Sequence, residues 1–93
     1  MAKLTAAEIQ EQLAKLPAWA RDGVAIRKTF RFPSFAAAIA FVDKVAVIAD
    51  AADHHPDILI RYDRVTLTLS THSAGGLTER DFALAAEIET IAP

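Results

Sequence analysis

Hydrophobic residues recur along this chain with two different periods, and the period changes at recognisable turns. Near the N-terminus, Ile9, Leu13 and Leu16 lie on one stripe at helical spacing. They follow Thr5-Ala6-Ala7-Glu8, which has the form of a capping box, and Pro17 closes the segment. The pattern predicts a first helix that begins at Thr5 and ends before Pro17.

A period of two replaces the helical period after Asp22-Gly23, a dipeptide typical of tight hairpin turns because glycine accepts a positive φ. One face of this segment is apolar except for Lys28 and the other is polar. The apolar face holds Val24, Ile26, Phe30 and Phe32, and the polar face holds Arg27, Thr29 and Arg31. We expect a strand with one solvated side, paired with a short strand near Trp19.

The segment from Phe35 to about Ala52 favours a helix, with Ser34 after Pro33 as its N-cap. Its apolar residues surround nearly the whole circumference. A helix of this kind is normally buried on more than one side. In so small a protein, we expect another subunit to cover the second side, as a homodimer or homotetramer.

Two further alternating runs surround Asp63-Arg64 and predict a second hairpin. The first run holds Ile58, Ile60 and Tyr62 on one face, and the second holds Val65, Leu67 and Leu69. A loop from His72 to Gly76 then leads to Thr78, which caps a last helix together with Asp81. Phe82, Ala85 and Ile88 mark that helix.

The predicted order of elements is therefore α-β-β-α-β-β-α. Two hairpins joined by a helix indicate an α+β fold, with a four-stranded antiparallel sheet and the helices packed on one face. The 93 residues are short enough to form a single domain, residues 1–93.

Composition and charge exclude several classes of protein. Ten basic against 12 acidic side chains give a net charge of −2 without a basic cluster, which argues against direct nucleic-acid binding. The chain has no cysteine, so disulfides and thiolate metal sites are excluded. The longest apolar stretch, residues 35–49, is too short to span a membrane and contains Asp43 and Lys44. The N-terminus lacks an apolar signal-peptide core, so we expect a cytoplasmic protein.

The three histidines, His54, His55 and His72, are the main candidates for chemistry. If Asp63-Arg64 is the hairpin turn, Tyr62 lies opposite Val65, and the same register places His55 opposite His72. Directly opposed residues have Cβ atoms about 4.5–5.5 Å apart. The histidines should therefore converge at one end of the hairpin, even after a slip of one or two residues.

Three readings of this histidine cluster remain open. A histidine near a strand end is often only a polar surface residue. An imidazole titrates near neutral pH, so one ring can donate a proton while another accepts one, and Asp50, Asp53 and Asp81 flank the cluster. A zinc site is the third reading. Adjacent strand residues point to opposite faces, which argues against His54 and His55 binding one ion, and we expect no metal.

The same residues resemble the signature of the pterin-4a-carbinolamine dehydratase family. The segment Asp50-Ala51-Ala52-Asp53-His54-His55-Pro56 is followed at fixed gaps by Tyr62, His72 and Asp81. The neighbouring segments Tyr62–Val65, Ser70–His72 and Gly76–Asp81 agree, and weaker similarity covers nearly the whole chain. Several fixed residues at fixed gaps make this a specific signal.

The resemblance implies an enzyme that dehydrates 4a-hydroxytetrahydropterin to quinonoid dihydropterin, without metal or organic cofactor. It implies that His54, His55 and His72 are the active-site histidines. We expect His54 and His72 to carry out acid–base catalysis, His55 to hold the pterin, and Asp81 to orient an imidazole. The implied substrate contacts come from the three histidines and from Asp50, Asp53, Ser70, Thr71, Ser73 and Trp19. For Trp19 a place in the hydrophobic core is the open alternative. The implied alternative is a non-catalytic dimerisation or assembly cofactor that binds a protein partner.

Overall fold

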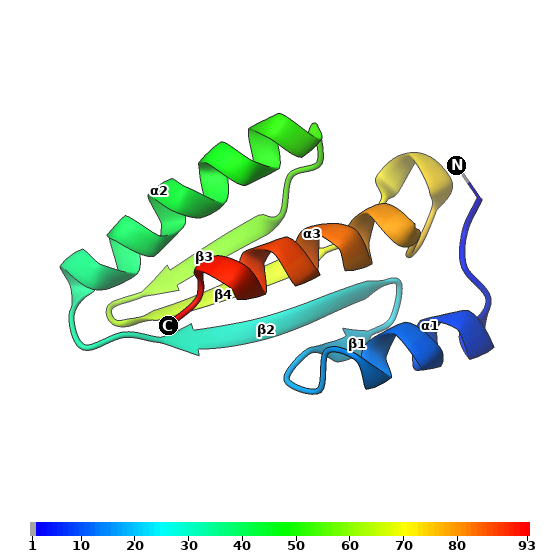
Figure 1. Ribbon diagram of the computed structural model, residues 1–93, viewed down its shortest axis with the longest axis horizontal. Coiled ribbons are helices and arrows are strands. Elements are labelled where there is room, and N and C mark those ends of the chain that lie inside the picture. The colour runs from blue at the N-terminus through cyan, green and yellow to red at the C-terminus, as the bar shows by residue number, and fades with distance from the viewer. Residues whose placement is uncertain (1) are drawn as a thin grey trace.

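The computed structural model describes residues 2–93, which form one α+β unit with three α-helices and four strands. The elements follow one another as α1 (Ala6–Ala14), β1 (Ala20–Asp22), β2 (Ala25–Arg31), α2 (Phe35–Ala52), β3 (Asp57–Arg61), β4 (Arg64–Leu69), the short 3₁₀ helix η1 (His72–Ala74) and α3 (Glu79–Ile91). The strands pair only in antiparallel fashion, in the order β1-β2-β4-β3 (Figure 1). The predicted fold class and order of elements are confirmed.

Each α-helix begins where a local capping residue satisfies its free amides. At α1 the Thr5 hydroxyl accepts from the Glu8 amide at 3.2 Å, and the Glu8 carboxylate accepts from the Thr5 amide at 2.9 Å. Ser34 caps α2 by accepting from the Ala37 amide at 3.1 Å. Thr78 and Asp81 form the second capping box, at α3. All three predicted helix starts are confirmed.

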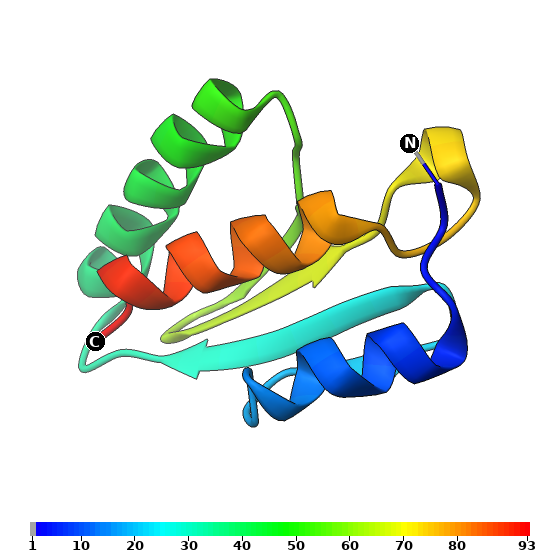
Figure 2. The ribbon, with the colours of Figure 1, turned by 45° about the vertical axis from the view of Figure 1, so that its right-hand side comes forward.

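The core lies on one face of the sheet, where all three helices pack. α3 runs across the middle of the sheet, with α2 on the β3 side and α1 on the β1 side (Figures 1 and 2). The buried cluster joins sheet and helix side chains, namely Ile26, Phe30, Val65, Leu67 and Leu69 with Ile9, Phe41, Val45, Phe82, Ala85 and Ile88. Lys28, the charged residue that interrupts the apolar face of β2, is accommodated because its Nζ bonds Glu89 at 2.7 Å and lies 4.5 Å from the Phe30 ring centroid.

Replacing Leu67 with Ala is expected to lower the free energy of unfolding by about 2–5 kcal/mol. Leu67 is fully buried in the centre of the sheet, so truncation removes apolar contacts and leaves a cavity. Denaturant unfolding measures the change. The matched control is Val24→Ala in an exposed turn, where the change should stay within about 0.5 kcal/mol. Equal losses for both variants would contradict this assignment of the core.

The turn of the second hairpin differs from its prediction by one residue, which shifts the register by two. Arg61 lies opposite Arg64 and Ile60 opposite Val65, so Tyr62-Asp63 forms the turn rather than Asp63-Arg64. A shift of two keeps every side chain on its face, so the hydrophobic alternation cannot distinguish the two registers. In the observed turn Tyr62 adopts a left-handed φ of 53°. The Phe32 amide, from the segment after β2, donates to the Asp63 carbonyl of this turn at 2.9 Å.

The first hairpin differs from its prediction in the opposite direction, because its turn lies one residue later in the chain. Asp22 lies opposite Ala25, so the turn is Gly23-Val24, with Gly23 at φ 62°. Val24 is therefore 61% exposed and does not share the buried face of Ile26. The Ser70 hydroxyl donates to the Val24 carbonyl at 2.6 Å. Ser70 is distant from this turn in the chain, so the turn preferences of residues 22–24 could not predict this contact. The short strand predicted near Trp19 is confirmed as β1.

Helix α2 buries one stripe and leaves apolar side chains outside it. Ala38, Phe41, Val45 and Ala49 are buried, whereas Val47 is 69% exposed. The expectation that a second subunit covers the outer side stays a prediction. Within residues 2–93, no helix combines the length and apolarity needed to cross a bilayer.

Candidate active site

The three histidines border one cleft of about 390 Å³, which lies where the C-terminal ends of α2 and β4 meet the first turn of α3. The cleft is lined by Asp53, His54, His55, Asp57, Ser70, Thr71, His72, Ser73 and Arg80. Its volume falls within the range of small-molecule sites. The histidines thus converge as predicted, although the strand register from which the prediction was made is not the one that the hairpin adopts.

His54 is the buried member of the cluster and is held by a buried carboxylate. Its Nε2 lies 2.6 Å from Oδ1 of Asp81, and Asp81 is fully buried. The other carboxylate oxygen accepts from the Thr71 hydroxyl at 2.8 Å and from the Thr78 amide at 2.9 Å. Because a carboxylate accepts hydrogen bonds, this network assigns a proton to Nε2 and leaves Nδ1 as the nitrogen available for proton transfer.

Local structure explains why Asp81 can hold His54. Asp81 is the third residue of α3, where the capping box turns its carboxylate back toward the helix start. The hydroxyls of Thr71, just after β4, and Thr78 lie 2.8 Å apart. One carboxylate therefore joins the end of β4, the start of α3 and the ring that follows α2.

His55 and His72 are the exposed members of the cluster. The Nε2 of His55 lies 2.8 Å from Oδ1 of Asp50, with both side chains more than half exposed. His72 begins η1 and also borders a neighbouring hollow on the uncovered side of the sheet. Exposed imidazoles can exchange protons with solvent, whereas His54 does so only through the hollows that it lines.

The predicted pairing of His55 with His72 is wrong. β3 begins at Asp57, two residues after His55, and His72 belongs to a helical turn rather than to a strand. Asp53 adopts a left-handed conformation, φ 48°, which turns the chain sharply at the end of α2. The histidines meet because this corner and η1 lie at the same end of the sheet, not because they oppose each other in a ladder.

The residues expected to contact substrate fall into two groups. Asp53, Ser70, Thr71 and Ser73 line the cleft, but the hydroxyl of Thr71 is committed to the buried network and that of Ser70 to the Val24 carbonyl. Asp50 contacts the cleft indirectly, through its bond to His55.

Trp19 lies outside the lining of the histidine cleft. It is 4% exposed and packs edge-on against Phe30, with ring centroids 6.1 Å apart. Its indole N–H has no partner within residues 2–93. These contacts place Trp19 in the hydrophobic core, which the sequence left as an alternative to a pocket role.

Two residues of the cleft, Arg80 and Asp57, were not predicted from the sequence. Arg80 lies directly before Asp81 in the segment that resembles the family signature, and this adjacency was the available signal. Asp57 carried no such signal, because it reads as an ordinary strand start.

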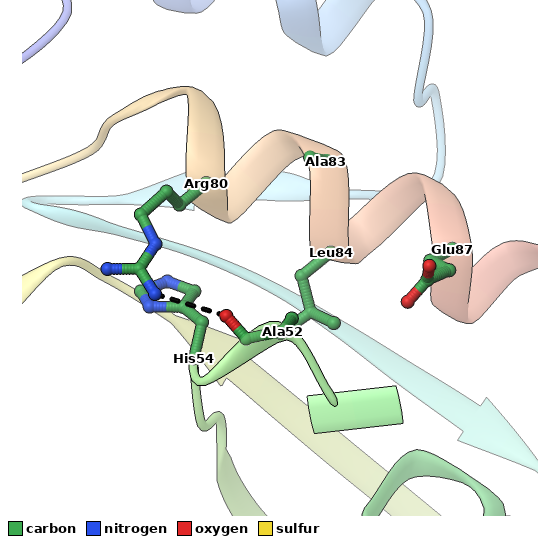
Figure 3. Close-up of a pocket in the computed structure, with 6 residues that line it drawn as sticks. All are labelled: Ala52, His54, Arg80, Ala83, Leu84 and Glu87. Carbon is green, nitrogen blue, oxygen red and sulfur yellow. Dashed lines mark hydrogen bonds between the residues drawn. The ribbon is translucent and has the colours of Figure 1, made fainter. Parts of the chain in front are cut away.

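His54 also borders a second hollow, of about 230 Å³ (Figure 3). Ala52, Arg80, Ala83, Leu84 and Glu87 complete its lining. His54 and Arg80 therefore line both hollows. Within residues 2–93, no group of three or more His, Asp or Glu side chains is placed to hold a metal ion.

Comparison with known proteins shows which family this chain belongs to. The family model described as "Pterin 4 alpha carbinolamine dehydratase" matches residues 2–91. The chain belongs to this family. It is 61% identical over 90 residues to a "Putative pterin-4-alpha-carbinolamine dehydratase" of Roseiflexus castenholzii, covering 97% of each chain. A protein of the same description from Chloroflexus aurantiacus is 60% identical over 91 residues, with 98% of each chain covered.

Two solved structures of this dehydratase fold extend the comparison. A transcriptional coactivator/pterin dehydratase from Brucella melitensis has a TM-score of 0.93 and 38% identity, covering 98% of this chain and 99% of that one. A pterin dehydratase-like protein identified as a RuBisCO assembly factor in the alpha-carboxysome has a TM-score of 0.69 and 29% identity. It covers 81% of this chain and 89% of that one. The fold thus occurs in proteins described as dehydratases and in one described as an assembly factor.

Proposed function

We propose that this protein dehydrates 4a-hydroxytetrahydropterin to quinonoid dihydropterin and water. The observation that carries the proposal is the His54–Asp81 pair, an imidazole oriented by a fully buried carboxylate at the wall of a cleft that two further histidines border. A ring fixed in this way has one defined nitrogen available for proton transfer.

The reaction requires two proton transfers and the cleavage of one bond. One imidazolium donates a proton to the departing 4a-hydroxyl, the C4a–O bond breaks with its electron pair leaving as water, and a second, neutral imidazole removes the proton from N5. We assign these two roles jointly to His54 and His72, which border the cleft from different segments of the chain. After turnover their protonation states are exchanged; the exposed His72 returns to its starting state by exchange with solvent, and His54 by exchange through the cleft that it lines.

The remaining cleft residues are assigned to holding the bicyclic ring. His55, fixed by Asp50, is placed to contact the pterin, and Asp53 with the segment 70–73 supplies polar groups around it, partly from the backbone. No step of this reaction requires an organic cofactor or a metal. Aromatic amino acid hydroxylases are the class of enzyme that would form the substrate, and the product would be reduced again to tetrahydropterin.

His72→Ala is expected to slow catalysed dehydration by about 10²-fold or more, because general acid–base catalysis typically contributes about 10²–10⁴-fold. His72 is exposed, so the variant should fold normally. Stopped-flow absorbance of carbinolamine decay, with and without protein, measures the rate. Thr90→Ala, an exposed position at the end of α3, is the control and should keep the wild-type rate. A loss under twofold for His72→Ala would remove this residue from the mechanism.

The second candidate function is a non-catalytic assembly or dimerisation role. It is favoured by the similarity to the RuBisCO assembly factor and by the exposed apolar side chains of α2. The same stopped-flow experiment separates the two candidates, because a scaffold would leave the decay of the carbinolamine at its uncatalysed rate. The expected homo-oligomer is tested by light scattering at micromolar concentration.

A further inference from the structure

The side chain of Arg80 bonds the backbone immediately before His54. Its Nη2 donates to the Asp53 carbonyl at 2.6 Å and to the Ala52 carbonyl at 3.1 Å, the second of which is drawn in Figure 3. These carbonyls belong to the last residue of α2 and its C-cap. Carbonyls at a helix C-terminus lack intrahelical partners, and a cation there is favourable.

The corner that presents His54 is a sharp turn of the chain. Asp53 is in the left-handed region at φ 48° and ψ 43°, a conformation that glycine, and less often aspartate or asparagine, adopts as a single residue. The His54 amide still donates to the Ala49 carbonyl at 3.1 Å, so the helix extends its bonding to the edge of the corner. Beyond that bond, the direction of the His54 side chain depends on how the corner is fixed to the rest of the fold.

Arg80 and Asp81 are consecutive residues in the first turn of α3 and hold consecutive parts of this corner. Arg80 bonds the backbone of residues 52–53, and Asp81 bonds the ring of His54. The capping box and the Thr71 hydroxyl fix this turn of α3 in place. The backbone of residues 52–53 and the ring of His54, which together form the His54 corner, are thus both held by the first turn of α3.

We propose that Arg80 is a positioning residue that sets the location of the His54 ring by fixing the end of α2 against α3. This inference rests on the proposed function only for its catalytic consequence. A displacement of a reacting group by about 1 Å can cost about 10²-fold in rate. Arg80 would therefore control turnover without a contact to the reacting atoms.

Two other roles for Arg80 make different predictions. Because Arg80 also lines the cleft, it could contact the substrate directly, and its loss would then raise KM while leaving kcat unchanged. If Arg80 were only a helix cap, its loss would lower stability without changing the His54–Asp81 bond. The positioning role predicts a fall in kcat, a KM within about threefold, and a changed His54–Asp81 bond.

The experiment compares Arg80→Gln and Arg80→Lys with Arg64→Gln, an exposed arginine of the sheet that lies outside the cleft lining. The first readout is stopped-flow kcat and KM, and the second is the proton NMR resonance of the His54 Nε2–H, assigned by its loss in His54→Gln. We expect Arg80→Gln to lower kcat about 10- to 100-fold and to shift or broaden that resonance. Arg80→Lys, which can still donate to the carbonyls, should recover part of both. Arg64→Gln should match the wild type.

The NMR readout keeps this inference separate from the proposed function. If the wild type fails to accelerate dehydration, the proposed function is rejected, and the resonance in Arg80→Gln still decides whether the corner is fixed by Arg80. An unchanged resonance in the folded variant overturns the inference whatever the rate. An effect on KM alone also overturns it, in favour of direct substrate contact. Should Arg80→Gln fail to fold, the same two readouts on Arg80→Lys decide, because weakened bonds to both carbonyls must still alter the resonance.

Discussion

Replacing His54 with Gln is expected to lower kcat for carbinolamine dehydration by about 10²–10⁴-fold with little loss of stability. His54 bonds Asp81 through Nε2, and the amide nitrogen of glutamine can reach a similar position and donate the same hydrogen bond. The amide cannot accept and release a proton near neutral pH, so the chemistry is removed while the buried carboxylate stays paired. Stopped-flow kinetics and denaturant unfolding measure the two effects separately.

His54→Ala is the matched comparison for this variant. It removes the donor to Asp81 as well as the proton-transfer group, and an unsatisfied buried acceptor costs about 1–3 kcal/mol, more when it is charged. We therefore expect equal losses of activity in the two variants, but a clear loss of stability only in His54→Ala. If His54→Gln retained activity within twofold of the wild type, His54 could not be one of the two proton-transfer groups.

Replacing Asp81 with Asn is expected to lower both activity and stability. The Asp81 carboxylate accepts from three donors, the His54 ring, the Thr71 hydroxyl and the Thr78 amide. Asparagine turns one acceptor oxygen into an NH₂ donor, so either a buried donor loses its partner, at about 1–3 kcal/mol, or the His54 ring must change tautomer to accept from that NH₂. The imidazole is then no longer held in one tautomer. In a serine-protease triad the same substitution costs about 10⁴-fold for this reason, and we expect at least about 10²-fold here.

The control for Asp81→Asn is Asp43→Asn, which changes an exposed carboxylate on α2. Its effect on the free energy of unfolding should stay within about 0.5 kcal/mol, and its kcat should match the wild type. Denaturant unfolding and the dehydration assay measure both variants. Wild-type activity in a folded Asp81→Asn protein would show that the buried network serves stability alone.

The local features of this fold could be read from the sequence because their causes are local. Thr5, Ser34 and Thr78 each cap a helix through residues within three positions, so the signal lies in adjacent letters. The alternation of β4 likewise reports which face is buried, and Val65, Leu67 and Leu69 are all fully buried. The alternation of β2 did not explain Lys28, because the partner of its charge, Glu89, lies 61 residues away in the chain.

The candidate site was only partly predictable, because its geometry depends on contacts between distant segments as well as on local ones. That His54, His55 and His72 meet at one end of the sheet follows from the order of the elements and survives the shift in register. The sequence did not separate their environments, although His54 is buried on Asp81 while the other two are exposed. Burial depends on how α3 packs against the end of α2, which no spacing within one segment specifies.

The sequence by itself determined the elements, the α+β class and the group of residues that could carry acid–base chemistry, because capping, alternation and turn preference act over a few residues. Only the tertiary structure decided the register of the second hairpin, the removal of Trp19 from the site and the attachment of Arg80 to the His54 corner. Each of these depends on a contact between segments distant in the chain. Such contacts are selected by the packing of the whole core, so neighbouring residues do not encode them.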